Sequence, residues 1–380
     1  MEFVYDVAES AASPAVIKVI GLGGGGCNAI NNMIENTIQG VEFISANTDA
    51  QSLGKNNAAK RIQLGTNLTR GLGAGANPEI GREAALEDRE RIKELVSGTD
   101  MLFITAGMGG GTGTGAAPVV ARLAKEMGML SVGVVTVPFA FEGNRKKRTA
   151  MEGITKMQSQ MDALIAVEND NLLKLPENRR MSMVKAFDCA DGILKQAINC
   201  VAELILTTGV INVDFADVTT IFRQSESSDA LLGIGRSARS AVEAVQIAAE
   251  SPLIDKGLKG ARGVILNLTG DDTLSLYDVD EATHYIVDHT DPEVNIILGT
   301  VVDEEMNGAV QATIIATDFA DSVVMKAPTV KVPESKVKKD TFQLDTPSFM
   351  DKSAPTNGFR QPSAFAIPAF KLTDDKDEKK

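Results

Sequence analysis

The chain has 380 residues, of which 43% are hydrophobic, so it is long enough for two domains with sizeable cores and for tails besides. Lys and Arg total 38 against 51 Asp and Glu, which gives a formal net charge of −13. Nucleic acid and anionic membranes repel such an acidic chain, which argues against bulk binding to either but does not exclude a local basic patch.

The few cysteines and histidines argue against a metal cluster or a disulfide framework. Cys27, Cys189 and Cys200 form no CxxC pair, and the histidines are His284 and His289. The N-terminus lacks an apolar signal core, and no apolar run approaches the roughly 20 residues that a membrane span needs. We therefore expect reduced thiols, no direct membrane insertion and a cytoplasmic protein.

After a flexible leader at 1–14, the first half of the chain alternates apolar runs with helical patterns. The runs predict strands at 16–20, 41–45, 101–105, 132–137 and 163–167. Strands that alternate with helices indicate βαβ units and a parallel sheet. The sequence therefore predicts a Rossmann-like, doubly wound α/β domain over 15–181, with ligands at the carboxyl ends of its strands.

A long helical pattern follows, and it predicts a central helix within 182–208. Beyond it come an apolar run at 218–222, a helix near 238–248 and strands at 263–268, 295–302 and 309–316, which together indicate a second α/β domain with a mixed sheet over 209–321. From 322 the chain becomes polar and rich in proline, so we expect a disordered linker at 322–361 and a tail at 362–380.

The segment 109–115, Gly-Gly-Gly-Thr-Gly-Thr-Gly, is the most informative feature of the chain. It follows an expected strand and leads into an expected helix at 116–127. Glycines allow successive backbone N–H groups to face an anion, and a helix start adds unpaired donors and partial positive charge. Thr112 and Thr114 carry hydroxyl groups that can bind phosphate oxygens. The segment is typical of a phosphate-binding loop.

A second glycine-rich loop, 21–26, fits the GxGxxG pattern after a strand. Alone it is compatible with a tight turn that binds nothing, or with a nicotinamide-dependent oxidoreductase whose ribose acid is Asp49. The oxidoreductase hypothesis does not account for 109–115. A Walker P-loop is absent.

Six segments in order carry a resemblance to the tubulin/FtsZ superfamily, and within it to the FtsZ family of bacterial cell-division GTPases. They are 23–28, 47–50, 71–78, 109–115, 138–143 and 212–217. The resemblance spans about residues 15 to 320. It implies a GTP-binding domain, a central helix and a C-terminal domain that carries a catalytic loop.

The resemblance also implies the residues that bind the nucleotide. The phosphates would contact Gly24, Gly25, Gly26, Cys27 and Asn28 in the first loop and Gly110, Gly111, Thr112, Gly113 and Thr114 in the second. The loop with Ala74, Gly75 and Ala76 would detect the γ-phosphate, and Asp49 belongs to the same site. Mg²⁺ would be held mainly through the phosphates, with no protein metal ligand assigned.

The nucleoside is assigned to four further residues. Glu142 would contact the ribose with Lys146 beside it, and Phe187 would stack on the base, although core packing explains that aromatic equally well without the resemblance. Asp191 would accept the guanine N1–H and amino group. An acceptor-only carboxylate selects guanine over adenine, which lacks this pair of donors.

The segment 212–217 has two interpretations. From its residues alone it is a turn into a helix N-terminus, with Asp214 as the cap. If Phe187 and Asp191 bind the base near the start of the long helix, however, these aspartates lie beyond its far end. The resemblance implies that Asn212, Asp214 and Asp217 enter the neighbouring subunit's site and polarise the attacking water. Such hydrolysis requires head-to-tail stacking, which can repeat into a filament.

The tail segment 365–370 resembles the family's recognition peptide for membrane-tethering division proteins, through Ile367, Pro368 and Phe370. The residue before the Ile-Pro pair is Ala366 in place of the usual acid. Elsewhere Lys146 stands where the family often has Arg, and 225–229 replaces a stretch rich in Met and Gly.

The leading interpretation is a polymerising GTPase that forms the cytokinetic ring scaffold at mid-cell. The alternatives are the oxidoreductase and a structural protein that assembles without hydrolysis. The presence of Asp214 and Asp217 argues against the second alternative.

Overall fold

The structure is a computed structural model, and it describes residues 15–35, 40–175, 181–207, 213–225, 227–254 and 257–319. Several predictions fall outside these residues: the leader at 1–14, the linker and tail with Ile367, Pro368 and Phe370, and the proposed catalytic residue Asn212. They stay predictions.

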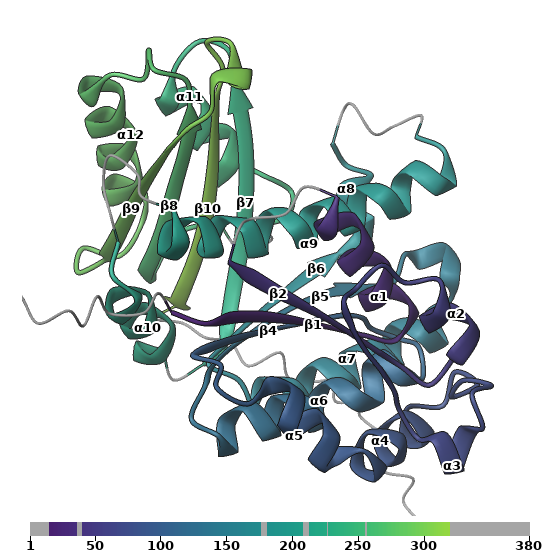
Figure 1. Cartoon of the computed structure of the whole chain (residues 1–380). Helices are drawn as coiled ribbons and strands as arrows, with labels where there is room; N and C mark the ends of the chain where they lie inside the picture. The colour runs from purple at the N-terminus through teal and green to yellow at the C-terminus, as the bar shows by residue number, and fades with distance from the viewer. Residues whose placement is uncertain are drawn as a thin grey trace, which may run out of the picture. The chain divides into compact units, whose positions relative to one another are not determined.

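The described elements follow one another as the sequence predicts, strands alternating with helices (Figure 1). The first half contains β1 (Ile17–Leu22), α1 (Gly23–Ile34), β2 (Val41–Asn47), α2 (Ala50–Gly54), β3 (Lys60–Gln63), α3 (Thr66–Thr69), α4 (Pro78–Glu87), α5 (Arg89–Val96), β4 (Met101–Gly107), α6 (Thr112–Glu126), β5 (Leu130–Val137), α7 (Asn144–Gln158), β6 (Ala163–Glu168) and α8 (Asn169–Leu172). The second half contains α9 (Met183–Leu206), α10 (Phe215–Gln224), β7 (Asp229–Ser237), α11 (Ala241–Ala249), β8 (Ala261–Gly270), α12 (Leu276–His289), β9 (Asn295–Val302) and β10 (Val310–Phe319).

In the described part of the chain the strands form one sheet, in the order β3-β2-β1-β4-β5-β6-β7-β10-β8-β9. The first six strands are parallel and doubly wound, while β10 runs antiparallel to β7 and β8. The two halves of the sheet meet at β6 and β7, which pair through Leu164↔Asp229 and Ile165↔Ala230. The predicted architecture of a parallel domain, a long helix and a mixed-sheet domain is confirmed.

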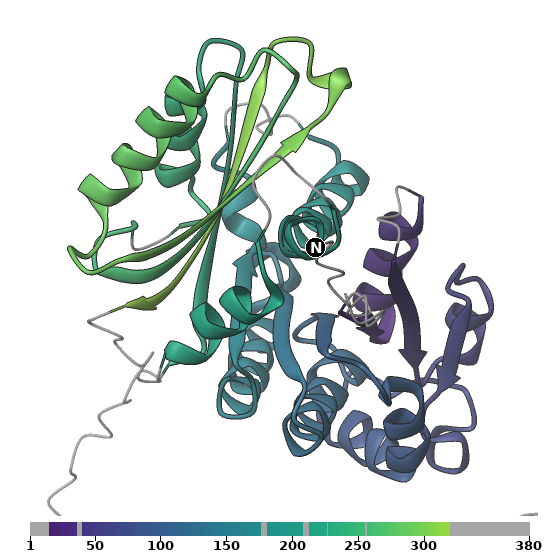
Figure 2. The ribbon, with the colours of Figure 1, turned by 60° about the vertical axis from the view of Figure 1, so that its left-hand side comes forward.

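Helices cover the sheet on two faces, which explains why its central parallel strands are mostly apolar. All residues of β1 and β5 are buried, as expected for parallel strands enclosed on two sides. One core packs the strands against α4, α5, α6 and α7, and another packs them against α1 and α9 (Figure 1). In the second half α11 and α12 form a further core on the sheet face opposite α9 and α10 (Figure 2).

The central helix α9 has 24 residues, a length of about 36 Å, and begins within one residue of its predicted start. Ser182 caps it by accepting a hydrogen bond from the Lys185 N–H at 3.3 Å. Its buried residues pack against strands of both halves of the sheet. Among the described residues, none of the helices combines the length and apolar character that crossing a bilayer requires.

Candidate functional site

Two helices begin in the glycine-rich segments, and each begins earlier than the sequence predicts. Helix α1 starts at Gly23, directly after β1, so residues 23–26 form its first turn rather than a loop. Helix α6 starts at Thr112 rather than 116. The direct transition from β1 is possible because Gly23 adopts φ +71°, a conformation that residues with a Cβ rarely take.

Close packing explains most of these glycines. A Cβ on Gly26 would lie 2.5 Å from the Thr105 carbonyl oxygen, and one on Gly23 would lie 2.8 Å from the Gly113 nitrogen. The two helix starts are therefore in contact with each other. At Gly24 and Gly110, in contrast, a Cβ would meet no described protein atom within 4 Å. These two residues mark where the loops face open space.

The electrostatics of the paired helix starts favour an anion. Within the described residues, no side chain caps α1 or α6, and neither helix has an acidic residue in its first turn. Their first N–H groups thus lack intrahelical partners and carry partial positive charge. Two such ends side by side, with open space at Gly24 and Gly110, can bind successive phosphates of one ligand.

The side chains of these loops have different roles. The Thr114 hydroxyl accepts the Gly109 N–H at 2.8 Å, and the Thr112 hydroxyl lies 2.6 Å from that of Thr48, so both hydroxyl groups hold the loop in place. Cys27 is buried, and burial raises the pKa of its thiol to about 11. The thiol therefore stays protonated and does not supply a thiolate to the site. Asn28 is exposed.

The loop that the resemblance assigns to the γ-phosphate is strained and held from several sides. Ala76 has φ +58° and Arg70 has φ +54°, conformations that are uncommon without glycine. The loop touches α6, because a Cβ on Gly111 would lie 2.8 Å from that of Ala74. On its other side the Gly73 N–H donates to the Thr48 carbonyl at 3.3 Å.

The neighbouring side chain Asp49 has a local partner. Its carboxylate caps α2 by accepting the N–H groups of Gln51 and Ser52, at 2.9 and 3.1 Å. Asp49 thus shapes the turn beside the site, and its carboxylate is already hydrogen-bonded.

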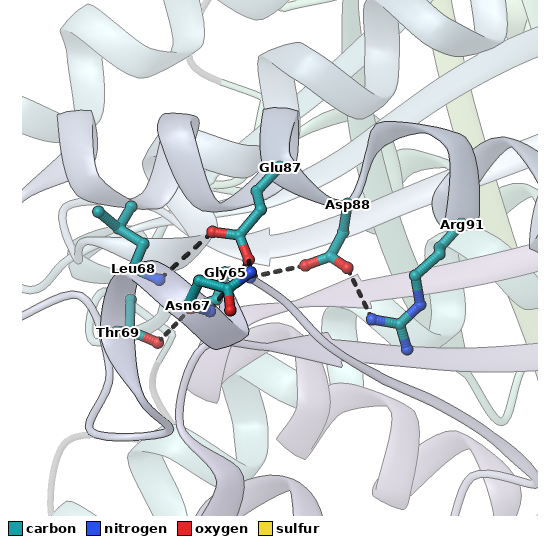
Figure 3. Close-up of polar contacts among 7 residues, drawn as sticks. All are labelled: Gly65, Asn67, Leu68, Thr69, Glu87, Asp88 and Arg91. Atoms are coloured by element: carbon teal, nitrogen blue, oxygen red, sulfur yellow. Dashed lines mark hydrogen bonds and ion pairs between the residues drawn. The ribbon is translucent and has the colours of Figure 1, made fainter.

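Two carboxylates at the end of α4 anchor the start of α3, the short helix that leads into this loop (Figure 3). Asp88 is buried and accepts the Gly65 N–H at 2.7 Å, while Arg91 contacts its other oxygen at 2.6 Å. Glu87 accepts the N–H groups of Asn67 and Leu68 at the start of α3. The short helix that leads into the strained loop is thus held at its first turn.

The predicted ribose contact is oriented by its neighbours. Glu142 accepts the Phe139 N–H at 3.0 Å and the Lys146 ammonium at 3.1 Å. The Glu142 side chain is only 16% exposed, against 50% for Lys146. Lys146 therefore stabilises the carboxylate as a point charge and keeps donors to spare.

The predicted base site lies at the start of α9. Phe187 is 40% exposed and meets Phe139 edge-on, with ring centroids 5.4 Å apart, while Phe139 stacks on Phe141 at 5.0 Å. Asp191 lies one turn further on the same face of α9. It accepts the Asn32 amide from α1 at 3.3 Å, and burial, with the charge of Asp188, raises its pKa to about 7.

The two described aspartates of the segment 212–217 lie far from these loops. Asp214 occupies the N-cap position of α10 without a side-chain cap bond among the described residues, and Asp217 is exposed in the first turn. Helix α10 borders residues at the amino ends of β4 and β5, whereas the glycine segment follows the carboxyl end of β4. The seven residues of β4, which span about 23 Å, separate α10 from the glycine segment.

Family models match two parts of the chain. Residues 16–177 match the GTPase domain of the Tubulin/FtsZ family, and residues 228–320 match the C-terminal domain of the FtsZ family. A solved FtsZ dimer from M. jannaschii is 42% identical, covers 80% of this chain and 88% of its own, and superposes with a TM-score of 0.76. The chain belongs to the FtsZ family.

Two further solved structures place it within the superfamily. A mutant FtsZ from M. jannaschii is 41% identical, with a TM-score of 0.77 over 80% of this chain and 92% of its own. A CetZ protein from Haloferax volcanii, described as a GTPgS-bound protofilament, is 18% identical, with a TM-score of 0.67 over 80% and 94% of the two chains, and so shares the fold.

Membership in the FtsZ family makes the chain a GTPase that binds guanine nucleotide, on a fold that supports filament formation. The oxidoreductase hypothesis is therefore wrong. GxGxxG was misleading because the same glycine spacing serves any close contact between a strand, a helix start and a phosphate. Two features of this FtsZ-family chain fit a nucleoside triphosphate. They are the paired starts of α1 and α6 and the predicted base site with Phe187 and Asp191.

One further candidate for the nucleotide site was not predicted from the sequence. Asn169 begins α8 at the carboxyl end of β6, is buried, and has a side-chain oxygen without a partner among the described residues. The next residue, Asp170, accepts the Ala140 N–H at 2.9 Å beside Glu142. A polar residue directly after a predicted strand was the signal that could have identified it.

No group of three or more His, Cys, Asp or Glu within the described ranges has the arrangement of a metal site.

Proposed function

We propose that this FtsZ-family GTPase polymerises head to tail and hydrolyses GTP at the junction between subunits. The filaments would form the cytokinetic ring scaffold in cell division, at mid-cell in the cytoplasm. The compared FtsZ relatives come from the archaeon M. jannaschii, so the proposal concerns cell division in general rather than bacterial division alone.

The junction proposal rests on one observation. The glycine-rich segments lie at the carboxyl edge of the sheet, whereas the aspartates at the start of α10 lie at its amino edge. About 23 Å of strand lies between the glycine segment and α10, so Asp214 and Asp217 are too far away to contact their own nucleotide. Stacking a second subunit so that its α10 meets the loops of the first would complete the site. The contact is heterologous, and it repeats into a filament.

In the proposed junction each part has a task. The paired starts of α1 and α6 bind the phosphates, with Mg²⁺ neutralising part of their charge. Phe187 stacks on the base, and Asp191 accepts two guanine donors. From the next subunit, Asp214 and Asp217 orient the attacking water and accept its proton, with Asn212 beside them.

The γ-phosphate would couple hydrolysis to assembly. It would contact the strained loop at Ala74, Gly75 and Ala76, which faces the neighbouring subunit in such a filament. Loss of the phosphate removes those contacts and weakens the junction. A purely structural role without hydrolysis conflicts with the GTPase activity that comes with membership in the FtsZ family, and the exposed Asp214 and Asp217 at the start of α10 support hydrolysis.

We further propose the division into a GTP-binding domain at 15–181, a central helix at 182–208 and a C-terminal domain at 209–321. The linker at 322–361 and the tail at 362–380, through Ile367, Pro368 and Phe370, would connect the filament to membrane-tethering division proteins. Removing 362–380 should abolish partner binding and spare GTP turnover.

Mixing two inactive variants tests the junction. Asp217→Ala should bind GTP and hydrolyse it very slowly. Gly110→Asp should fold, because Gly110 faces open space, but its carboxylate should repel the phosphates. In the mixture, GTP held by the first variant meets an intact α10 from the second, so turnover should return. Two folded variants that show no complementation at any ratio would contradict hydrolysis between subunits.

A further inference from the structure

Helix α10 has three faces with different surroundings. Its buried face, with Val218, Ile221 and Phe222, packs on the second half of the sheet. Phe215, Thr219 and Arg223, spaced by four, line a cavity of about 260 Å³ whose other wall is the amino edge of β4 and β5. Asp217 is exposed. The helix that carries the proposed catalytic carboxylate therefore lies where the two halves of the sheet meet.

Arg223 links this helix to the nucleotide-binding half. Its guanidinium donates to the Gly128 carbonyl at 3.3 Å and pairs with the Asp162 carboxylate at 3.6 Å. Gly128 ends the turn after α6. Asp162 is held by Ser131, whose N–H and hydroxyl donate to it at 2.8 and 2.9 Å. Both partners of Arg223 are thus fixed points of the nucleotide-binding half.

A second link follows immediately, in the segment that departs from the family pattern. The Ser228 hydroxyl donates to the Gln158 carbonyl at 2.9 Å, and the Gln158 amide donates to Asp229 at 2.5 Å. Gln158 is the last residue of α7. We name Gln158, Asp162, Arg223, Ser228 and Asp229 the polar clasp.

The polar clasp lies where the sheet itself offers little restraint. Strands β6 and β7 pair through two residue pairs, while α10 packs by its buried face on the second half. A small rotation of the second half would therefore carry α10 with it. Asp217 lies six residues, or about 9 Å along the helix, from Arg223. A shift of about 1 Å in a catalytic group can cost a large part of the rate.

We propose that Arg223, with the polar clasp, positions α10 relative to the nucleotide-binding half and so sets how Asp217 reaches into the neighbouring subunit's site. Arg223 acts through Asp217 and touches no substrate, so it is a positioning residue. The inference rests on the proposed hydrolysis between subunits. It adds that the orientation of α10 is controlled from within the subunit that donates it.

The test asks whether Arg223→Ala slows hydrolysis of the GTP that it holds itself or of the GTP that its neighbour holds. Arg223→Ala is mixed with excess Gly110→Asp, so that GTP held by the Arg223 variant meets an intact α10; phosphate release per bound GTP should equal that of wild type in the same mixture. In the second mixture Arg223→Ala is combined with excess Asp217→Ala, so that α10 of the Arg223 variant acts on GTP held by an Asp217→Ala neighbour. Here the rate should be about threefold to tenfold lower than with wild type.

Two further variants sharpen the outcome. Arg223→Lys can make one of the two contacts and should recover part of the lost rate. Arg239→Ala is the matched control, since Arg239 is 83% exposed and pairs with Glu243 within the second half; it should match wild type in both mixtures. Equal rates for Arg223→Ala and wild type in the second mixture would overturn the proposal, and so would an equal loss in both mixtures.

The result separates this inference from the proposed function. If Asp217→Ala and Gly110→Asp fail to complement each other, the junction itself is wrong. If they complement and the Arg223 variant shows no directional defect, only the positioning role is wrong.

Discussion

The two edges of the nucleotide-binding sheet contrast in chemistry. At the carboxyl edge, glycines bring two uncapped helix starts into contact, and acidic side chains are absent from their first turns. At the amino edge, the start of α10 instead carries two exposed carboxylates, Asp214 at the N-cap position and Asp217 in the first turn. A phosphate bound at the carboxyl edge would thus avoid repulsion by carboxylates. In the proposed junction, a second subunit would supply the carboxylates that each subunit holds about 23 Å away from its own loops.

The sharpest challenge to this contrast is Asp214→Ala. Asp214 and Ser182 both occupy N-cap positions, but only Ser182 makes a side-chain cap bond among the described residues. We expect Asp214→Ala to lower hydrolysis by on the order of a hundredfold or more while changing the free energy of unfolding by less than about 0.5 kcal/mol. Phosphate release and thermal unfolding measure the two effects.

Ser182→Ala is the matched control for that variant. It should lose about 1 kcal/mol of stability and keep most of its turnover per folded subunit. If Asp214→Ala instead lost stability as Ser182→Ala does, Asp214 would be an ordinary cap, and the contrast between the edges would weaken.

A second pair of variants separates packing from binding within the glycine segment. A Cβ on Gly115 would lie 2.0 Å from the Pro78 carbonyl oxygen, whereas one on Gly110 would meet open space. Gly115→Ala should therefore cost about 1–3 kcal/mol of stability. Gly110→Ala should unfold at the wild-type temperature but bind GTP about tenfold more weakly, because its methyl group occupies the space in front of the loop. Calorimetric unfolding and nucleotide titration distinguish them; equal stability of the two variants would contradict the packing argument.

The base site should respond to pH. Burial raises the pKa of Asp191 from 3.8 to about 7, so the carboxyl of the empty site is protonated below pH 7. Two guanine donors require the ionised form, so GTP affinity should fall by up to about tenfold per pH unit below 7 and level off above it. Titration calorimetry at pH 6, 7 and 8 checks this against Asp191→Asn, whose affinity should lack this slope.

The same shift has a consequence for the stability of the empty protein. Between pH 4 and 7 the folded state holds a proton that the unfolded state has released, so the Asp191 contribution favours folding at low pH and is lost as the pH rises towards 7. If the free energy of unfolding of Asp191→Asn changed between pH 4 and 7 as steeply as that of wild type, the raised pKa of Asp191 would be contradicted.

The smallest expected effect concerns the anchor of the γ-phosphate loop. Glu87→Ala removes the acceptor of the Asn67 and Leu68 N–H groups and should cost about 1 kcal/mol, because these exposed groups can turn to water. Glu90→Ala removes an exposed ion pair with Arg89 and should cost less than about 0.5 kcal/mol. Denaturant unfolding of the two variants measures the difference.

Much of the architecture could be predicted from the sequence because buried parallel strands are continuous apolar runs. The first strands, the central helix and β9 lie at or near their expected positions. The helix starts at Gly23 and Thr112 could not be predicted, since glycine disfavours helices and only contact between β1, β4 and the two helices compensates for it. The apolar run 218–222 belongs to α10, and β3, β7 and α12 were not predicted.

In the candidate site, too, some features could be inferred from the sequence and others could not. Residue type and resemblance were enough to name candidates, such as the glycine-rich loops and the pair Phe187 and Asp191, and the roles of these residues stay predictions. Contacts between distant segments could not be inferred, and these include the Asn32 amide on Asp191, the unpartnered oxygen of Asn169 and the link from Arg223 to Gly128. Each depends on which loops the fold brings together.

The length of β4 has a final consequence for a filament built as proposed. Every subunit carries loops at one edge and carboxylates at the other, so a row of them ends differently on its two sides. On one side the last nucleotide has no neighbour to cleave it and stays a triphosphate however long the row becomes. The row therefore has a built-in direction, and its two tips should grow and shrink at different rates.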